Sequence, residues 1–404
     1  MRLFALSLSI ACTLPALAQA ADPCDVAVNN ACVDSDGFWP HAGASRFPSI
    51  GGTTALPEHL FSFGLISSYQ SRPVTLQTPS PGPTGSSSVA VDNQVTEHFL
   101  WAYGITDRLS GSFVLPVTVA QNGEGLRPIT GGDRLRSQSL RDLRFGLTYS
   151  IFDRTMAPRA GGPKVHVDDP TWEAHKPLSF GLAARLEISA PTGDRDAFST
   201  SGTAVFWPSL SGDVKFRRLL VASEIGVRVR EVREAFGTRQ GSQLAQAIGV
   251  SYDVWGNERL SPFAEFRYLV GLGSSGRARL DETGVLTHLN DGFAPAEWTV
   301  GARSGGWFGG DFAIDLSGGG GVPLTGDDFG TPRFRFTLGL RYAPQRRDSD
   351  GDGVLDLNDR CPTTYAPRPT DPDVPVDGCV HAEKQLDFSN ENQPATPTDP
   401  TRPR

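Results

Sequence analysis

The chain has 404 residues, of which 38% are hydrophobic and 20% charged, and it carries a formal net charge of −8. Because no stretch after the N-terminal region reaches ~18 consecutive apolar residues, a membrane protein built from several apolar helices is excluded. The acidic balance argues against a nucleic-acid partner, since such a partner requires a basic face that neutralises phosphates.

The N-terminus has the features of a secretory signal. Arg2 supplies a positive charge, residues 3–17 form an apolar stretch, and residues 18–20 read Ala-Gln-Ala, a small-x-small cleavage site. We therefore predict a signal peptide over residues 1–20. A lipoprotein acylated at Cys12 is the alternative, but apolar residues continue past that cysteine.

Removal of the signal leaves four cysteines, two near each end of the chain. They are Cys24, Cys32, Cys361 and Cys379. An even number of cysteines in an oxidising compartment indicates disulfides. Three pairings are possible, and proximity favours Cys24–Cys32 and Cys361–Cys379. The first pair lies in an N-terminal segment, residues 21–56, for which two placements are open: a plug or lid of the barrel, or a strand excluded from the bore.

Residues 57–343 consist of short segments in which apolar and polar residues alternate. In one of them, the five residues at every second position from Leu143 to Ile151 are apolar, and those between them are polar or glycine. Side chains alternate across a strand, so each segment has one apolar and one polar face. Twelve such segments lie at about 59–69, 94–105, 109–119, 141–152, 178–190, 204–216, 219–231, 243–254, 260–270, 296–305, 311–322 and 333–342.

These segments predict an all-β fold, an antiparallel transmembrane β-barrel of about 12 strands. A tilted strand needs ~9–11 residues to cross a bilayer, and bacterial outer-membrane barrels have an even number of strands. The alternative, a soluble sandwich, would bury the apolar faces. Charges at mid-strand favour the barrel, because both signs can pair across a lumen, whereas Arg or Lys facing lipid costs ~2–4 kcal/mol. The predicted lumen residues are Arg144, Arg185, Glu187, Asp213, Lys215, Glu224, Arg228, Glu265, Arg267, Asp315 and Arg335.

The connections between the segments alternate in length. Short ones lie near 106–108, 217–218, 256–258 and 309–310, and long ones at 70–93, 120–140 and 271–295. Short periplasmic turns and long external loops are typical of outer-membrane barrels. Residues 153–177 break this pattern. We expect the protein to contact lipid in the outer membrane of a Gram-negative bacterium, with everything after Tyr342 in the periplasm.

Residues 348–359 have the spacing of a calcium-binding loop. Carboxylates stand at positions 1, 3, 5, 9 and 12 of these twelve residues, and Gly353 at position 6 permits a sharp bend. An acidic solvated linker is the alternative. The predicted Ca²⁺ ligands are Asp348, Asp350, Asp352, Asp356, Asp359 and the carbonyl of Val354.

Together with Arg360-Cys361-Pro362 and Asp377-Gly378-Cys379, this loop resembles the thrombospondin type 3 repeat. The resemblance implies a unit over residues 345–380 that is held by Ca²⁺ and a disulfide instead of a large core. The domain order resembles that of outer-membrane protein A relatives. However, residues 381–404 are too few and too rich in Pro, Thr and Asn for their peptidoglycan-binding domain, and we predict a disordered tail.

A second resemblance concerns the barrel itself, which looks like outer-membrane transporter and phenol-degradation-type barrels. It rests on Pro191-Thr192-Gly193-Asp194, on Pro323-Leu324-Thr325-Gly326-Asp327 and on the final Leu340-Arg341-Tyr342. Twelve strands give a backbone diameter of about 24 Å. The bore therefore holds either a narrow water-filled channel or a plug.

We consider two main functions. The first is a narrow channel or facilitator for small solutes, whose charged lumen sets ion preference. The second is a non-conducting anchor for adhesion or an unknown protein partner, with a calcium-stiffened periplasmic stalk; a plug formed by residues 21–56 favours this reading. Catalytic residues are not expected, because no Ser and His are placed together facing lipid, and no G-x-S-x-G motif occurs.

Overall fold

The computed structural model describes residues 24, 30–78, 86–131, 134–152, 178–235, 238–255, 259–273, 276–280, 286–289, 294–307, 311–323, 330–344, 354, 359–361, 364, 366 and 377–379. The chain divides into two compact units. The first comprises residues 1–156 and 173–345, and the second residues 157–172 and 346–404.

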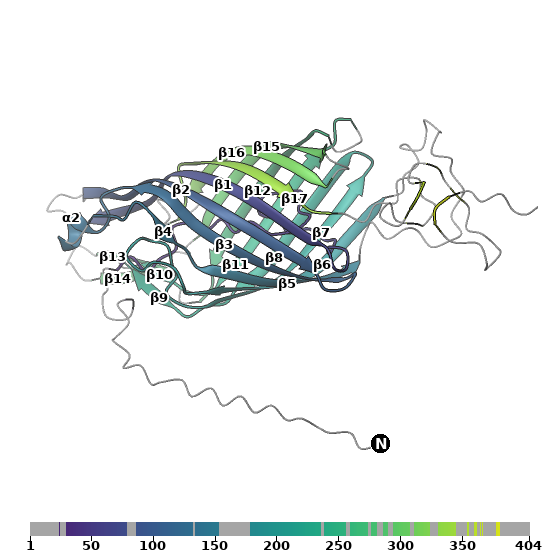
Figure 1. Cartoon of the computed structure of the whole chain (residues 1–404). Coiled ribbons are helices and arrows are strands. Elements are labelled where there is room, and N and C mark those ends of the chain that lie inside the picture. Colours follow the sequence, from purple (N-terminus) through teal and green to yellow (C-terminus); the bar gives the residue numbers. More distant parts are fainter. Residues whose placement is uncertain are drawn as a thin grey trace, which may run out of the picture. The chain divides into compact units, whose positions relative to one another are not determined.

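The first unit contains a closed barrel (Figure 1). Its strands are β1 Phe61–Thr78, β2 Ser86–Gly104, β3 Leu109–Asn122, β5 Leu143–Phe152, β6 Ser179–Ala190, β7 Val205–Phe216, β8 Leu219–Arg228, β11 Gln243–Tyr252, β12 Ser261–Gly271, β15 Pro295–Trp307, β16 Phe312–Pro323 and β17 Phe334–Tyr342. Each pairs antiparallel with the next, and β1 closes the barrel on β17 from Phe63↔Tyr342 to Ser71↔Phe334. The predicted 12-stranded antiparallel barrel is confirmed.

One predicted loop is wrong. Residues 70–93 were expected to connect two strands, but β1 continues to Thr78 and β2 already begins at Ser86. The loop was predicted because residues 70–93 are rich in Gly, Ser and Pro. In the structure Arg72 has a φ of 49°, and the β1–β2 register shifts between Ser71 and Val74, as in a β-bulge.

The connections β3–β5, β8–β11 and β12–β15 lie at the same end of the barrel, which we call the loop end; the other is the turn end. The loop end carries the one-turn helix α2 Arg127–Thr130 and β4 Ser139–Leu140, which pairs with β3. The strands β9 Arg233–Ala235, β10 Thr238–Gln240, β13 Gly276–Leu280 and β14 Leu286–Leu289 form a second sheet in the order β14-β13-β10-β9. The long predicted connection 153–177, between β5 and β6, lies outside the described residues.

Within the described part of the chain, no helix is both long enough and apolar enough to span a membrane.

The outside of the barrel is covered by large apolar side chains. Phe145, Phe180, Leu210, Ile225, Val300, Leu316 and Leu338 are each 46–61% exposed. Moving one such side chain from water into an apolar environment is favourable by about 1.5–3 kcal/mol. Contiguous apolar patches of this extent mark contact with lipid or another apolar surface. Strand alternation thus places the apolar face outward and the charged face inward.

The bore is filled by residues 30–57, which we call the plug. Ser35 N–H donates to the carbonyl of Phe198 (3.0 Å) in the β6–β7 connection, at the loop end. At the other end of the plug, Leu56 packs against Ala102 and Ala343, at the turn end. The plug therefore runs through the whole barrel before β1 begins. Wall glycines make room for it: a Cβ on Gly249 would lie 2.6 Å from the ring of Phe47.

Candidate functional site: the charged bore and its plug

The structure places the eleven predicted lumen residues on the inner wall. Nine are buried, namely Arg144, Arg185, Glu187, Asp213, Glu224, Arg228, Glu265, Asp315 and Arg335. Lys215 and Arg267 are half-buried. Most of these side chains do not line open space, because they contact the plug or one another.

The first polar contacts of the plug are at the loop end. Asp34 forms an ion pair with the buried Arg141, which lies just before β5. The hydroxyl of Ser35 donates to Oε1 of Gln94 (3.0 Å) on β2. Asp34 is thus fixed to the wall beside β5, and Ser35 is fixed to β2.

Asp36 anchors the plug to a chain of charges deeper in the bore. Its carboxylate lies 2.9 Å from Nη2 of Arg335, whose Nε lies 2.9 Å from Glu297. Glu297 in turn binds Arg267 at 2.5 Å. The guanidinium of Arg335 also lies 5.0 Å from the ring centre of Phe38, so the plug supplies both an anion and an aromatic face. Alternating charges on one network allow buried ions to compensate one another.

His41 is the next plug residue with charged partners on the wall. Its Nδ1 lies 2.6 Å from Glu187, and its Nε2 lies 3.2 Å from Glu224. Glu224 also accepts from the backbone N–H of Gly51 (2.7 Å) and pairs with Arg185 (3.0 Å). One histidine thus links carboxylates from β6 and β8.

Towards the turn end, the plug combines polar and apolar contacts. Ser49 binds Glu265, and the hydroxyl of Thr53 donates to Asp213 (2.7 Å). Arg303 donates to the carbonyl of Ser45. Phe47 and Ile50 pack against the inward side chains of β8, β11 and β12; the cluster comprises Phe47, Ile50, Leu220, Ala222, Ala247 and Phe263. The bore is therefore occupied along its length.

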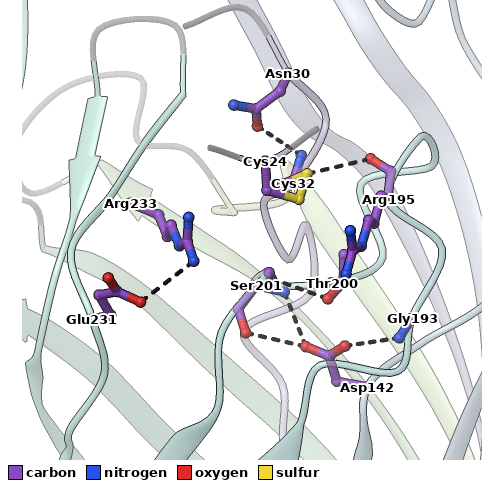
Figure 2. The surroundings of a disulfide bond; sticks show 11 residues. Cys24, Asn30, Cys32, Asp142, Gly193, Arg195, Thr200, Ser201, Glu231 and Arg233 are labelled. Atoms are coloured by element: carbon purple, nitrogen blue, oxygen red, sulfur yellow. Dashed lines mark hydrogen bonds and ion pairs between the residues drawn. A yellow bond between two sulfur atoms is a disulfide. The ribbon is translucent and has the colours of Figure 1, made fainter. Parts of the chain in front are cut away.

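A disulfide joins the start of the plug to Cys24 at the loop end (Figure 2). Cys24 and Cys32 are bonded, and Sγ of Cys32 lies 3.8 Å from the carbonyl of Arg195. Nearby, Asp142 accepts from the N–H groups of Gly193 (3.0 Å) and Ser201 (2.9 Å). Burial raises the pKa of the Asp142 carboxyl, although these hydrogen bonds oppose that rise.

The second unit contains the other disulfide and two of the predicted metal ligands. Cys361 is bonded to Cys379. Oδ1 of Asp359 accepts the N–H of Cys361 (2.6 Å), whereas its buried Oδ2 has no hydrogen-bond partner among the described residues. Val354 is buried. The remaining predicted ligands, Asp348, Asp350, Asp352 and Asp356, lie outside the described residues, and the described ones include no cluster of three metal-binding side chains. The Ca²⁺ site stays a prediction.

Several bore residues were missed by the sequence analysis. Glu297, Arg303 and Arg341 are buried on the inner wall, and the alternation of the predicted strands already placed them on the polar face. Asp36 and His41 gave no comparable signal, because the plug has no strand or helix period from which a direction follows. Their importance is set by wall residues far away in the sequence.

Comparison with known proteins adds only distant likenesses. No family model matches the sequence, and no curated protein is similar to it. Among solved structures, the chain is similar to the COG4313 outer membrane channel from Pseudomonas putida F1, with 13% identity, a TM-score of 0.48, and coverage of 72% of this chain and 98% of that one. It is also similar to the KdgM porin in complex with disordered oligogalacturonate (10% identity, TM-score 0.36, 70% and 99% covered). The NanC porin has 7% identity and a TM-score of 0.38, with 70% and 100% covered.

Proposed function

We propose that the protein is an outer-membrane channel for small solutes in a plugged state. The apolar exterior suits a bilayer, and the interior carries the charges that a hydrated pathway requires. The observation that carries the proposal is the way the plug is held. At successive levels of the bore, Asp36, His41 and Thr53 bind wall side chains by ion pairs or hydrogen bonds.

Polar contacts of this kind exchange readily for water. A hydrogen bond within a protein contributes a net ~0.5–1.5 kcal/mol, because water replaces it when it breaks. A plug held by such bonds can shift and admit water at a moderate cost in free energy, whereas a plug held by apolar packing alone would expose apolar surface to water. We infer that solutes cross when the plug is displaced from part of the bore.

A covalent lock tests this proposal. In a variant carrying Thr53→Cys and Asp213→Cys, oxidation joins plug and wall where the two native side chains lie 2.7 Å apart. After verified insertion into planar bilayers, we expect current from the reduced variant and none from the oxidised one. Wild-type protein receives the same oxidant and reductant as a control, because its two native disulfides also respond to them.

The two failures have different meanings. Equal current from the oxidised and reduced variant would refute displacement of the plug. No current from wild type or variant at any voltage would refute conduction altogether.

The second candidate is the non-conducting anchor, and the filled bore favours it. The cavity beside Arg228 in the bore measures only about 50 Å³. In this version the outer loops bind a partner or surface, and the second unit acts as a periplasmic stalk. Crosslinked envelopes should then yield a specific protein partner, while planar bilayers show no current.

We further propose that the second unit binds Ca²⁺ in the periplasm, as its thrombospondin type 3-like loop suggests. The supporting observation is the buried Oδ2 of Asp359, which lacks a protein partner among the described residues while Oδ1 takes the Cys361 N–H. A carboxylate oxygen of this kind suits a hard cation. Asp359 and the carbonyl of Val354 would hold the ion together with the aspartates of residues 348–356, and the ion would neutralise their mutual repulsion.

A further inference from the structure

Two buried arginines of the bore lack carboxylate partners among the described residues. Arg144 is 3% exposed and Arg228 is 6% exposed. Nη1 and Nη2 of Arg144 and Nε of Arg228 have no hydrogen-bond partner in the described part of the chain. The Nη atoms of Arg228 lie 3.4 Å from the carbonyl of Gly37. In contrast, Arg185 and Arg335 each bind a carboxylate at 3.0 Å or less.

Both unpaired guanidinium groups adjoin a plug tryptophan. Arg144 lies 5.0 Å and Arg228 lies 4.3 Å from the ring centre of Trp39, and Arg228 lies 4.7 Å from that of Trp207. Aromatic faces attract cations, but they leave the N–H donors of the guanidinium unsatisfied. A buried charge without an anion is costly, so this part of the bore favours an anionic ligand.

A cavity of about 50 Å³ lies beside Arg228, in the loop-end half of the bore. One water needs ~10–15 Å³ on this measure, so the space holds several waters or a ligand of a few heavy atoms. Its walls include the apolar side chains of Trp39, Trp207, Ala245 and Leu269, which form one cluster. The indole Nε1 of Trp207 is a second buried donor without a partner among the described residues.

The acidic residues at the cavity do not supply the missing anion. Asp34, Glu224 and Glu297 line it, but Asp34 already pairs with Arg141, Glu224 with Arg185 (3.0 Å) and Glu297 with Arg267 (2.5 Å). Their charges are therefore compensated by other arginines. The uncompensated charges at this level are the cations.

We propose that this cavity is a binding site for a small monocarboxylate with a short apolar chain. The carboxylate accepts from Nε of Arg228 and Nε1 of Trp207, because Arg presents its donors in the planar geometry that carboxylates match. The apolar chain packs on Trp39 and Leu269, and Arg144 adds positive potential from the far side of the cluster. The claim that the bore selects such a solute rests on the proposed function. Binding of the ligand in the cavity can be tested without measuring any current.

Ligand-detected NMR of the full chain in detergent micelles measures binding directly. The probe is butyrate in low-chloride buffer, and its neutral isostere butyramide controls for partition into micelles. We expect saturable binding of butyrate and no comparable binding of butyramide. Arg228→Gln should weaken butyrate binding about tenfold or more, since a hydrogen bond to a charged group is lost. Arg228→Lys should restore part of it.

The exposed Arg218 provides the matched control, because Arg218→Gln removes the same group outside the cavity. Heat-dependent mobility in SDS gels verifies that each variant retains a folded barrel. Equal binding of butyrate and butyramide, unchanged binding by Arg228→Gln, or a loss equal to that of Arg218→Gln would overturn the site. Displacement by chloride at the same concentration would overturn the preference for an organic anion. A protein that binds butyrate but passes no current retains the site and loses the channel.

Discussion

Arg335 is the wall residue whose removal should release the plug. Besides its ion pairs with Asp36 and Glu297, it donates to the hydroxyl of Ser68 (2.8 Å) and to Oε1 of Gln70 (3.1 Å). Arg335→Met keeps a long side chain beside Phe38 but removes the charge. Arg333→Met is the control, because Arg333 is exposed just before β17.

The geometry shows which carboxylate loses its compensating charge in Arg335→Met. Glu297 keeps Arg267 at 2.5 Å, whereas Asp36 keeps the backbone N–H of Phe38 (3.1 Å), within the plug itself, and His98, whose Nε2 is 3.7 Å away. The uncompensated carboxylate therefore belongs to the plug. Breaking a buried pair on one side costs about 3–5 kcal/mol, and Asp36 escapes that cost when the plug leaves the bore and water reaches it. Each 1.4 kcal/mol is about tenfold in population, so the population with a released plug should increase by a factor of about 10² to 4 × 10³.

Trypsin reports on the release. Trypsin cleaves after Lys and Arg, and Arg46, followed by Phe47, is the one such residue in residues 30–57. Cleavage after Arg46 therefore requires an accessible plug. When reclosing outpaces cutting, the cleavage rate follows the released population. Mass spectrometry of the new N-terminus at Phe47 should show much faster cleavage in Arg335→Met than in wild type or Arg333→Met. Equal rates in all three proteins would refute the argument that this ion pair holds the plug.

Three further predictions concern the two disulfide regions and the loop end. Replacing Cys24 and Cys32 by Ser removes a cross-link of sequence separation 8, worth at most about 2.5 kcal/mol, and should speed hydrogen exchange at residues 30–35 without changing the gel mobility of the barrel. Calorimetry should detect Ca²⁺ binding by the full chain at about 10⁻⁴–10⁻³ M, and Asp350→Asn with Asp352→Asn should abolish it; absence of binding in wild type would contradict the site. The pKa of Asp142 is raised in the folded state, so on acidification the folded protein binds a proton at this carboxyl before the unfolded chain does. The stabilisation by Asp142 therefore grows as pH falls through the raised pKa, and it is complete below the pKa of the unfolded state. The stability difference between wild type and Asp142→Asn, followed by urea unfolding, should change in that direction with pH; a difference independent of pH would exclude this account.

The barrel could be predicted from the sequence because one physical rule acts at every strand. An apolar exterior and a charged interior impose a period of two, and the predicted segment 141–152 matches β5 Leu143–Phe152 closely. Where composition competed with alternation, the prediction failed: residues 70–93 are rich in Gly, Ser and Pro, but the β1–β2 hairpin extends into them and accommodates Pro73 at a bulge. Arg144 and Arg335 could be assigned to the lumen by the same alternation.

The contents of the bore could not be predicted in the same way. The plug is a Gly- and Ser-containing segment without periodicity, so its sequence gives no direction for any side chain. Its course is determined by distant partners: His41 and Glu187 are 146 residues apart, and Asp34 and Arg141 are 107 apart. Pairings at such separations leave no local pattern. Even the discriminating question, whether residues 21–56 enter the barrel, required the three-dimensional structure.

The path of the plug changes the sidedness of the molecule. Twelve barrel strands alone would return the polypeptide to the side from which it started, but the plug adds one more traverse in front of β1. The total is odd, so Cys32 and Ala343 lie at opposite ends of the barrel. In the proposed outer-membrane orientation, with the turn end in the periplasm, an epitope inserted beside Cys32 should be stained on intact cells, whereas one placed directly after Ala343 should require permeabilisation of the envelope.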